Sequence, residues 1–309
     1  MMVSPYIHNE ETIVIKFQSR SLRAVRLAAV SAAGGLTAFL MPASGVAAEP
    51  AAGAAEAPAY SITGNVSFNS DYVWRGLTQT FGGPALQFGA DFRHRSGIYA
   101  GFWASNVSEK WVPGANLETD YYAGYKTEIA PGLFLDLNLL YVYYPGGDYS
   151  KALDGRTFQS SRPHTLEPSI GLVYEWVSVK YGRTLSKFYG WNVNNSAPGV
   201  FSAEDVHAGV KGSTRGSQYV ELGASYDVWE SVNLSLQLGR EWVANSSGLD
   251  WSYLRVGVSK TLADNWSVGL SVWGTTQPAA FKDYVALTGS GDTESVGRTR
   301  AVLSIARAF

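Results

Sequence analysis

Polar and apolar residues alternate along much of the chain, and this alternation limits the possible folds more than any other feature. In the stretch VNLSLQLG, residues 232–239, valine and leucine alternate with asparagine, serine and glutamine. Successive side chains of a β-strand point to opposite faces, so this pattern predicts strands with one apolar and one polar face. We identify twelve such segments, beginning near residues 60, 84, 98, 117, 133, 164, 177, 218, 232, 252, 266 and 299. After residue 60, no stretch shows the 3.6-residue repeat of apolar residues that is typical of an amphipathic helix.

The connections between these segments alternate between short and long. HRSG, TEIAPG, EW, WES and ADN are short turns, whereas stretches such as PGGDYSKALDGRTFQSSRP are long and polar. Bacterial outer-membrane barrels have short periplasmic turns and long external loops, and an even strand number follows from that topology. The sequence therefore predicts an all-β, transmembrane, antiparallel up-and-down β-barrel of about 12 strands in the bacterial outer membrane.

A water-soluble barrel or sandwich is the alternative fold for alternating strands. Such a protein carries many Lys and Glu residues on its polar faces. Here the polar faces are mostly Ser, Asn, Gly and Thr, and charged residues make up only 16% of the chain against an average near 25%. The composition therefore favours a barrel with its apolar face outward, toward lipid.

The N-terminal region has the features of an export signal. Arg20, Arg23 and Arg26 precede an apolar stretch at 27–41, and the small residues of ASGVAAEP permit cleavage after Ala48. We expect a signal peptide with an atypically long N-terminal extension at 1–48, an Ala/Pro/Glu linker at 49–59 and the barrel at 60–309. A buried core helix and a start codon downstream of Met1 are the alternatives for this region.

Several classes of function lack support in the sequence. The absence of cysteine excludes disulfides, thiolate catalysis and zinc–thiolate sites, and a net charge of −2 gives no sign of a nucleic-acid partner. No spacing typical of a metal or cofactor site occurs. A barrel hydrolase is a minor alternative, in which His164 would act with Ser160, Ser161 or Glu167, or His207 would act in another loop. We expect no enzymatic activity and no cofactor.

The stretch SDYVWRGLTQT, residues 70–80, follows the first segment. If the alternation continues, Tyr72 and Trp74 face lipid at the external interface, where aromatic side chains concentrate, and Asp71 and Arg75 face the lumen. The strand would then end at Gly76, where the first loop begins. The aromatic residues expected at the opposite interface, beside the short turns, are Trp176, Trp229 and Trp266.

The blocks SDYVWRGLTQT, GPALQFGADF, SGIYAGFWASNV, ETDYYAGYKTE and LNLLYVYYPGG resemble, in this order, successive blocks of the TorF porin family. Its members are bacterial outer-membrane proteins predicted to be barrels, so the resemblance implies a channel but no particular solute. It covers mainly residues 61–147. The C-terminal RAVLSIARAF also resembles the terminal-aromatic signal for outer-membrane assembly, with Phe309 as the signal residue and Arg307 in an unusual place.

The inward face of the predicted barrel carries charges of both signs. The candidate lumen residues are Asp71, Arg75, Asp91, Arg93, Glu118, Asp120, Asp136, Glu167, Lys180, Glu221 and Arg255. Large inward residues such as Trp103 and Trp273 predict a narrow or partly occluded bore. We expect a porin or narrow channel for passive diffusion of small hydrophilic solutes or ions, with the lipid bilayer and the outer-membrane assembly machinery as its partners. A non-conducting barrel that binds a partner through its loops is the alternative.

Three residues fit these strand registers poorly. Arg183 and Arg240 have outward parity, and Pro168 lies inside a strand. Bulges in these strands, or registers shifted by one residue, are the two possible explanations.

Overall fold

The computed structural model describes residues 58–200, 205–276 and 278–309. The expected signal peptide at 1–48 and most of the expected linker at 49–59 lie outside these residues. In the described part of the chain, no helix has the length and apolar character needed to cross a membrane.

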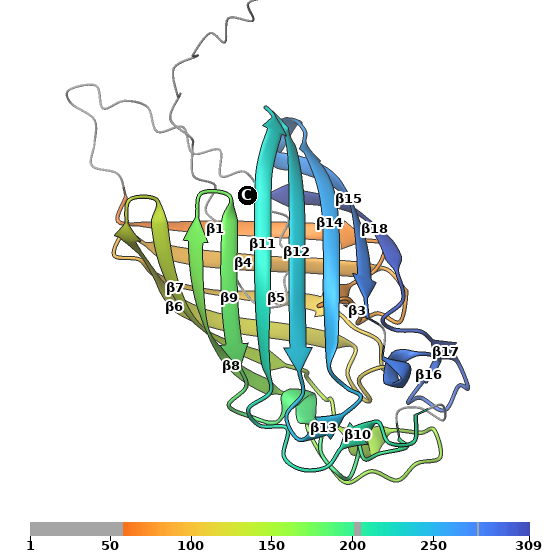
Figure 1. Ribbon diagram of the computed structural model, residues 1–309. Coiled ribbons are helices and arrows are strands. Elements are labelled where there is room, and N and C mark those ends of the chain that lie inside the picture. Colours follow the sequence, from red (N-terminus) through yellow and green to blue (C-terminus); the bar gives the residue numbers. More distant parts are fainter. Residues whose placement is uncertain (1–57, 201–204, 277) are drawn as a thin grey trace, which may run out of the picture.

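Twelve long antiparallel strands close into a barrel in which each strand pairs with its neighbours in the sequence and the first pairs with the last (Figure 1). The strands are β1 (Tyr60–Asn69), β4 (Ala85–His94), β5 (Ile98–Asn106), β6 (Leu117–Ala130), β7 (Leu133–Tyr143), β8 (Thr165–Tyr174), β9 (Val177–Arg183), β11 (Gln218–Trp229), β12 (Val232–Trp242), β14 (Trp251–Thr261), β15 (Trp266–Thr275) and β18 (Arg300–Ala308). Each alternating segment of the sequence corresponds to one of these strands. The predicted twelve-stranded antiparallel barrel is therefore confirmed.

Short turns join the strands at one end of the barrel and longer loops join them at the other (Figure 1). In the short turn after β6, Gly132 has a φ of 74°, which glycine adopts without strain. The longer loops carry the small strands β2 (Val73–Trp74), β3 (Leu77–Thr78), β10 (Gly209–Val210), β13 (Ser246–Ser247), β16 (Tyr284–Val285) and β17 (Thr293–Glu294). Four 3-10 turns are also present in the described residues: η1 (Tyr149–Lys151), η2 (Phe188–Gly190), η3 (Ala263–Asn265) and η4 (Ala279–Phe281).

The outer surface of the barrel wall is apolar. In β12, the side chains of Leu234, Leu236 and Leu238 are exposed over 40–47% of their surface. The residues between them face inward, since Gln237 donates a hydrogen bond to Glu221 and Ser235 accepts one from Arg255. Apolar side chains outside and polar ones inside are the reverse of the arrangement in a water-soluble protein.

The three residues that fitted poorly are accommodated without a change of register at those positions. Pro168 pairs with Leu139 of β7, while pairing of β8 with β9 begins only at Ser169, so the missing N–H of the proline interrupts no β8–β9 bond. Arg183 and Arg240 are exposed on the outer surface at the loop end of the barrel. Register shifts occur elsewhere, beside short turns, between Glu128 and Ala130 and between Asp227 and Trp229.

Inward tyrosines lie over glycines of neighbouring strands. Tyr219 of β11 covers Gly182 of β9, and Tyr253 of β14 covers Gly239 of β12, so closely that a Cβ atom at either glycine would collide with the tyrosine ring. An aromatic ring that packs over a glycine on an adjacent strand replaces the missing side-chain contact. These pairs hold the two rings flat against the lumen wall.

The barrel closes at a seam between the two ends of the chain. β1 pairs with β4 along its whole length, from Tyr60 to Asn69, but pairs with β18 only from Asn65 to Asn69. The backbones of Gly64 and Phe309 extend this seam with hydrogen bonds of 2.9 and 3.3 Å.

Candidate functional site in the barrel lumen

The first loop folds into the barrel instead of leaving it. β1 ends at Asn69, and β2 and β3 form a small hairpin inside the lumen, with Arg75 and Gly76 as its two-residue turn. Tyr72 is fully buried and Trp74 is 7% exposed. The prediction that these two aromatic residues face lipid is therefore wrong, because the alternation of β1 stops before it reaches them.

Arg75, at the tip of this hairpin, contacts several strands of the barrel wall. Its guanidinium forms ion pairs with Glu167 of β8 at 2.9 Å and with Glu241 of β12 at 2.7 Å. The Arg75 Cζ atom also lies 3.4 Å from the centre of the Tyr219 ring and 4.4 Å from that of Trp74. All three charged side chains are at most 3% exposed, so these ion pairs are shielded from solvent.

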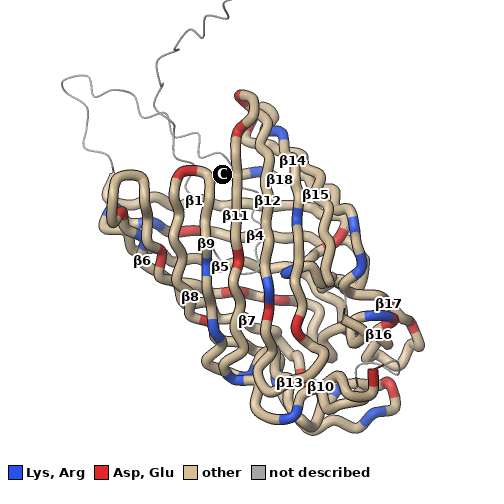
Figure 2. Tube along the Cα trace, viewed as in Figure 1, with Lys and Arg blue, Asp and Glu red and all other residues tan. Residues whose placement is uncertain are grey.

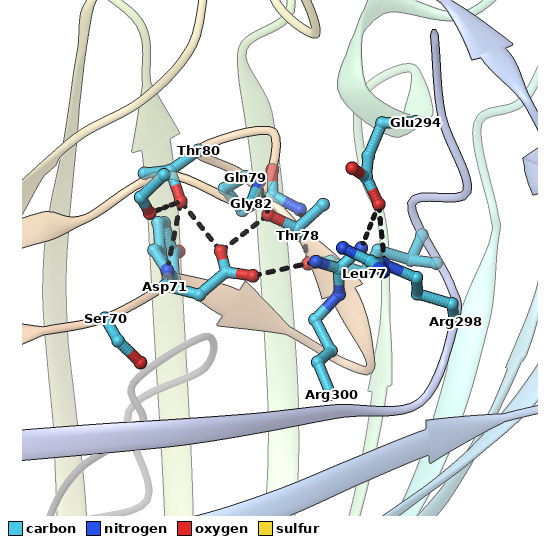
Figure 3. A network of polar contacts seen from close by, with 12 residues as sticks. Ser70, Asp71, Leu77, Thr78, Gln79, Thr80, Gly82, Glu294, Arg298 and Arg300 are labelled. Atoms are coloured by element: carbon cyan, nitrogen blue, oxygen red, sulfur yellow. Dashed lines mark hydrogen bonds and ion pairs between the residues drawn. The ribbon is translucent and has the colours of Figure 1, made fainter.

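The base of the hairpin is tied to the far end of the chain (Figure 3). The hydroxyls of Thr78 and Thr80 lie 2.6 and 2.7 Å from Asp71 Oδ1. Arg300, the first residue of β18, pairs with Asp71 at 3.0 Å and with Glu294 of β17 at 2.8 Å. Charged groups thus connect the first loop with the last strand and the last loop.

A third set of contacts fixes the middle of the first loop. The Tyr72 hydroxyl donates a hydrogen bond to Glu118 of β6 at 2.8 Å, and its ring meets Trp103 of β5 edge to face. The indole N–H of Trp251 in β14 donates to the backbone carbonyl of Arg75 at 2.7 Å. The hairpin therefore has partners on opposite sides of the barrel.

Aromatic side chains fill the space between this hairpin and the other loops. Trp74 packs against Tyr189, with ring centres 5.0 Å apart, and against Trp251 at 6.4 Å. A cavity of about 20 Å³ remains among Trp74, Phe188 and their neighbours. This is room for about one water molecule, so these aromatic side chains leave little free space between the hairpin and the neighbouring loops.

The other end of the lumen is more open. Asp91 and Arg255 point into the barrel on this side and are only partly buried. A cavity of about 360 Å³ beside the β4–β5 turn is lined by Arg93, Lys126 and other residues. Solvent thus has access to the lumen wall at the short-turn end.

The other predicted lumen residues also lie inside. Asp136 accepts a hydrogen bond from the Tyr99 hydroxyl at 2.6 Å, while Asp120 is 1% exposed and Lys180 is 8% exposed. Figure 2 shows that acidic and basic positions are scattered over the barrel rather than forming a region of one sign. The structure brings Arg75 and Glu167 into contact, but it does not join the predicted residues into a single ring.

Sequence reasoning missed the roles of several residues. It gave Tyr219, Tyr253 and Trp251 no function, although they surround Arg75, and it did not pair Glu241 with Arg75. The one local signal was the Arg75–Gly76 pair between two short β-prone segments, which is typical of a two-residue hairpin. Nothing local indicated that this hairpin would enter the lumen.

The expected interface aromatics at the short turns are exposed. Trp176 is 48% exposed, Trp229 72% and Trp266 37%, and Phe309 at the chain end is 64% exposed. Their exposure at one end of an apolar surface is typical of side chains that lie at a membrane–water interface.

In the part of the chain that the structure describes, the side chains suggested for a hydrolase around His164 have other partners. Nδ1 of His164 accepts a hydrogen bond from the backbone N–H of Tyr144 at 3.3 Å. Ser160 and Ser161 donate to Asp148 and to the carbonyl of Gly190, and Glu167 is paired with Arg75. In the described ranges, no three His, Asp or Glu side chains are placed to hold a metal ion.

Outside the barrel wall, Asp148 joins the two ends of its loop. Its carboxylate accepts hydrogen bonds from the N–H and hydroxyl of Ser150, the hydroxyl of Ser160 and the N–H of Ser161. Partial burial raises the pKa of Asp148, but these hydrogen bonds outweigh it and bring the pKa down to about 2.

Solved structures of low similarity to this chain include outer-membrane channels. The KdgM porin matches with 9% identity and a TM-score of 0.45, covering 80% of this chain and 99% of its own. The NanC porin matches with 7% identity and a TM-score of 0.47, covering 81% and 99%. An outer-membrane channel from Pseudomonas putida F1 matches with 12% identity and a TM-score of 0.44, covering 85% and 100%.

No curated protein matches the chain significantly. One family model, described as a bacterial protein of unknown function, matches residues 51–309 and so includes the whole barrel. The chain therefore belongs to this bacterial family, Gcw_chp.

Proposed function

We propose that the protein is an outer-membrane channel for small hydrophilic solutes, narrowed by its own first loop. The observation that carries this proposal is a closed barrel with an apolar outer surface and a polar, charged inner wall. The membership in a bacterial family and the resemblance to the TorF porin family support it.

The outer surface favours a lipid environment. Large apolar side chains are exposed around the wall, for example Leu222 at 51%, Val256 at 52% and Leu303 at 63%. A surface of this extent would be unstable in water, whereas a closed barrel satisfies its backbone hydrogen bonds inside a bilayer. The long loops would face the exterior and the short turns the periplasm, with Phe309 serving as the assembly signal.

The first loop would set the size of the passage. Glu118, Glu167 and Glu241 line the wall where the hairpin crosses the lumen, and each contacts Tyr72 or Arg75. Solutes would pass when the hairpin shifts, so the channel would be narrow and its open state infrequent. This differs from a wide porin whose lumen is permanently filled with water.

Single-channel recording in planar bilayers tests this proposal. The refolded native chain should give small, infrequent current steps, and a variant with residues 72–79 replaced by a short Gly/Ser linker should give larger and longer ones. A shift of the unboiled band on a gel would verify that both chains are folded barrels.

If both folded barrels give no current, the channel proposal is wrong. The filled loop end would then favour the second candidate function, a non-conducting barrel that binds a partner through its loops. A native chain with large, permanent current steps would contradict the role proposed for the first loop.

A further inference from the structure

We propose that Glu167, Glu241 and the ring of Tyr219 form a binding site for solutes that carry a guanidinium group, and that Arg75 occupies this site while the hairpin is inside the lumen. The inference rests on the proposed channel function, because it names the class of solute that the channel would bind at its constriction.

The geometry of the site matches a planar cation. Glu167 presents both carboxylate oxygens to Arg75, at 2.9 and 3.4 Å from the guanidinium nitrogens, and Glu241 contacts Nη1 at 2.7 Å. The guanidinium carbon lies 3.4 Å from the centre of the Tyr219 ring. Two carboxylates at the edges and an aromatic face suit a guanidinium better than the compact charge of an ammonium group.

The residues of the site belong to the barrel wall and not to the loop. Glu167 comes from β8, Tyr219 from β11 and Glu241 from β12, and the packing of Tyr219 over Gly182 keeps its ring in place. Only the cation comes from the hairpin. The site would therefore persist when the hairpin moves away.

The wall also offers more acceptors than Arg75 uses. Glu241 is 1% exposed, and its Oε1 atom has no hydrogen-bond partner among the described residues. Buried acceptors are normally satisfied, so this oxygen indicates a place where a ligand with a further N–H group can donate a hydrogen bond.

Departure of Arg75 would leave Glu167 and Glu241 without their cation. Carboxylates in a poorly solvated place are stabilised by a replacement positive charge. The hairpin and a guanidinium solute would thus compete for one site, and binding of the solute would favour withdrawal of the hairpin.

Chemical rescue of an Arg75→Ala variant tests the site without measuring current. Thermal unfolding of the refolded barrel in detergent would be followed with methylguanidinium, methylammonium or methylurea added at equal ionic strength. We expect methylguanidinium at about ten times its Kd to raise the unfolding midpoint of the variant by roughly 3 °C. The native chain and the exposed-surface variant Arg215→Ala should show no such rise.

The double variant Arg75→Ala/Glu241→Gln should lose most of this shift, since one carboxylate of the site is gone. If Arg75→Ala does not refold alone, its refolding yield with each additive replaces the unfolding midpoint as the measurement. The proposal is overturned if methylguanidinium has no effect, or if methylammonium or methylurea has the same effect. A silent barrel that still shows the rescue would contradict only the channel function.

Discussion

The position of the Tyr219 ring depends on a glycine of the neighbouring strand. The ring lies over Gly182 and also contacts the guanidinium of Arg75. A methyl group at position 182 would meet the ring and push it from the wall. The site around Arg75 is thus set partly by the absence of a Cβ atom one strand away.

We therefore expect Gly182→Ala to lower the free energy of unfolding by about 1–3 kcal/mol, which is typical of an overpacked position. Gly171→Ala is a matched control, because Gly171 is also buried in the wall but its nearest neighbours leave ordinary van der Waals space, at 3.6 Å or more. Urea unfolding of both variants in lipid vesicles would compare them. Equal losses in the two variants would show that the Tyr219 ring does not depend on Gly182.

At the residue scale, the sequence predicted which side of the barrel wall a strand residue faces better than it predicted where the strand ends and the loop begins. The parity of β1 was correct up to Asn69, but it carried no information for Tyr72 and Trp74, which follow the end of the strand. The lumen position of Arg75 was predicted for a strand residue, whereas Arg75 reaches the lumen from a hairpin. Its partner Glu167 is 92 residues away, and no local pattern encodes that distance.

The strands, in contrast, were predictable as elements. Each strand separates an apolar from a polar environment, so apolar and polar residues alternate along it. This pattern gave even the starting positions of β1 and β5 correctly. The loops have no such period. Their course depends on contacts between distant segments, such as that between Trp74 and Tyr189, and could not be derived from either segment alone.

The loop between β7 and β8 provides a test at this scale, because Asp148 holds its two ends together. Its pKa of about 2 lies below the ordinary value of 3.8, so the ionised form stabilises the folded loop. This stabilisation is complete above about pH 4 and is lost as the pH falls through about 2. Protonation would free Ser150 and Ser160 from a charged acceptor.

Asp148→Asn imitates the protonated form, so the loop should open more often and be cleaved about 2- to 10-fold faster than the native loop by thermolysin at pH 7. With pepsin near pH 2 the ratio of the two rates should fall toward one, since about half of native Asp148 is then protonated and most of its stabilising effect is lost. Mass spectrometry of the fragments would locate the cuts. A ratio that stays the same at both pH values would contradict this role of Asp148.

The whole molecule exposes apolar side chains on its outer surface and places polar side chains in its lumen. Leu236, in the middle of β12, faces outward, while Gln237 beside it donates a hydrogen bond to Glu221 inside the barrel. The outer band must therefore tolerate charge poorly at mid-height and better near its edges. Arg183 and Arg240, the outward arginines of β9 and β12, lie at the loop end and agree with this rule.

Leu236→Arg should accordingly lower the free energy of unfolding in lipid vesicles by about 2–4 kcal/mol, because the charge would lie at the bilayer midplane. Val232→Arg, at the short-turn end of the same strand, should cost only about 0–1 kcal/mol. Reversible urea unfolding, followed by tryptophan fluorescence, measures both. Equal costs would indicate that this surface does not face hydrocarbon.

The tie between the first loop and the last strand has a consequence for the order of assembly. Asp71 and Arg300 are 229 positions apart and meet only where β1 joins β18, at the seam that closes the barrel. During assembly the base of the hairpin therefore cannot be fastened through Asp71 until the final strand has arrived. Arg75 at the tip has its partners on β8 and β12, so an unfinished barrel would already hold the tip of the hairpin, and completion of the circle would add the tie at its base.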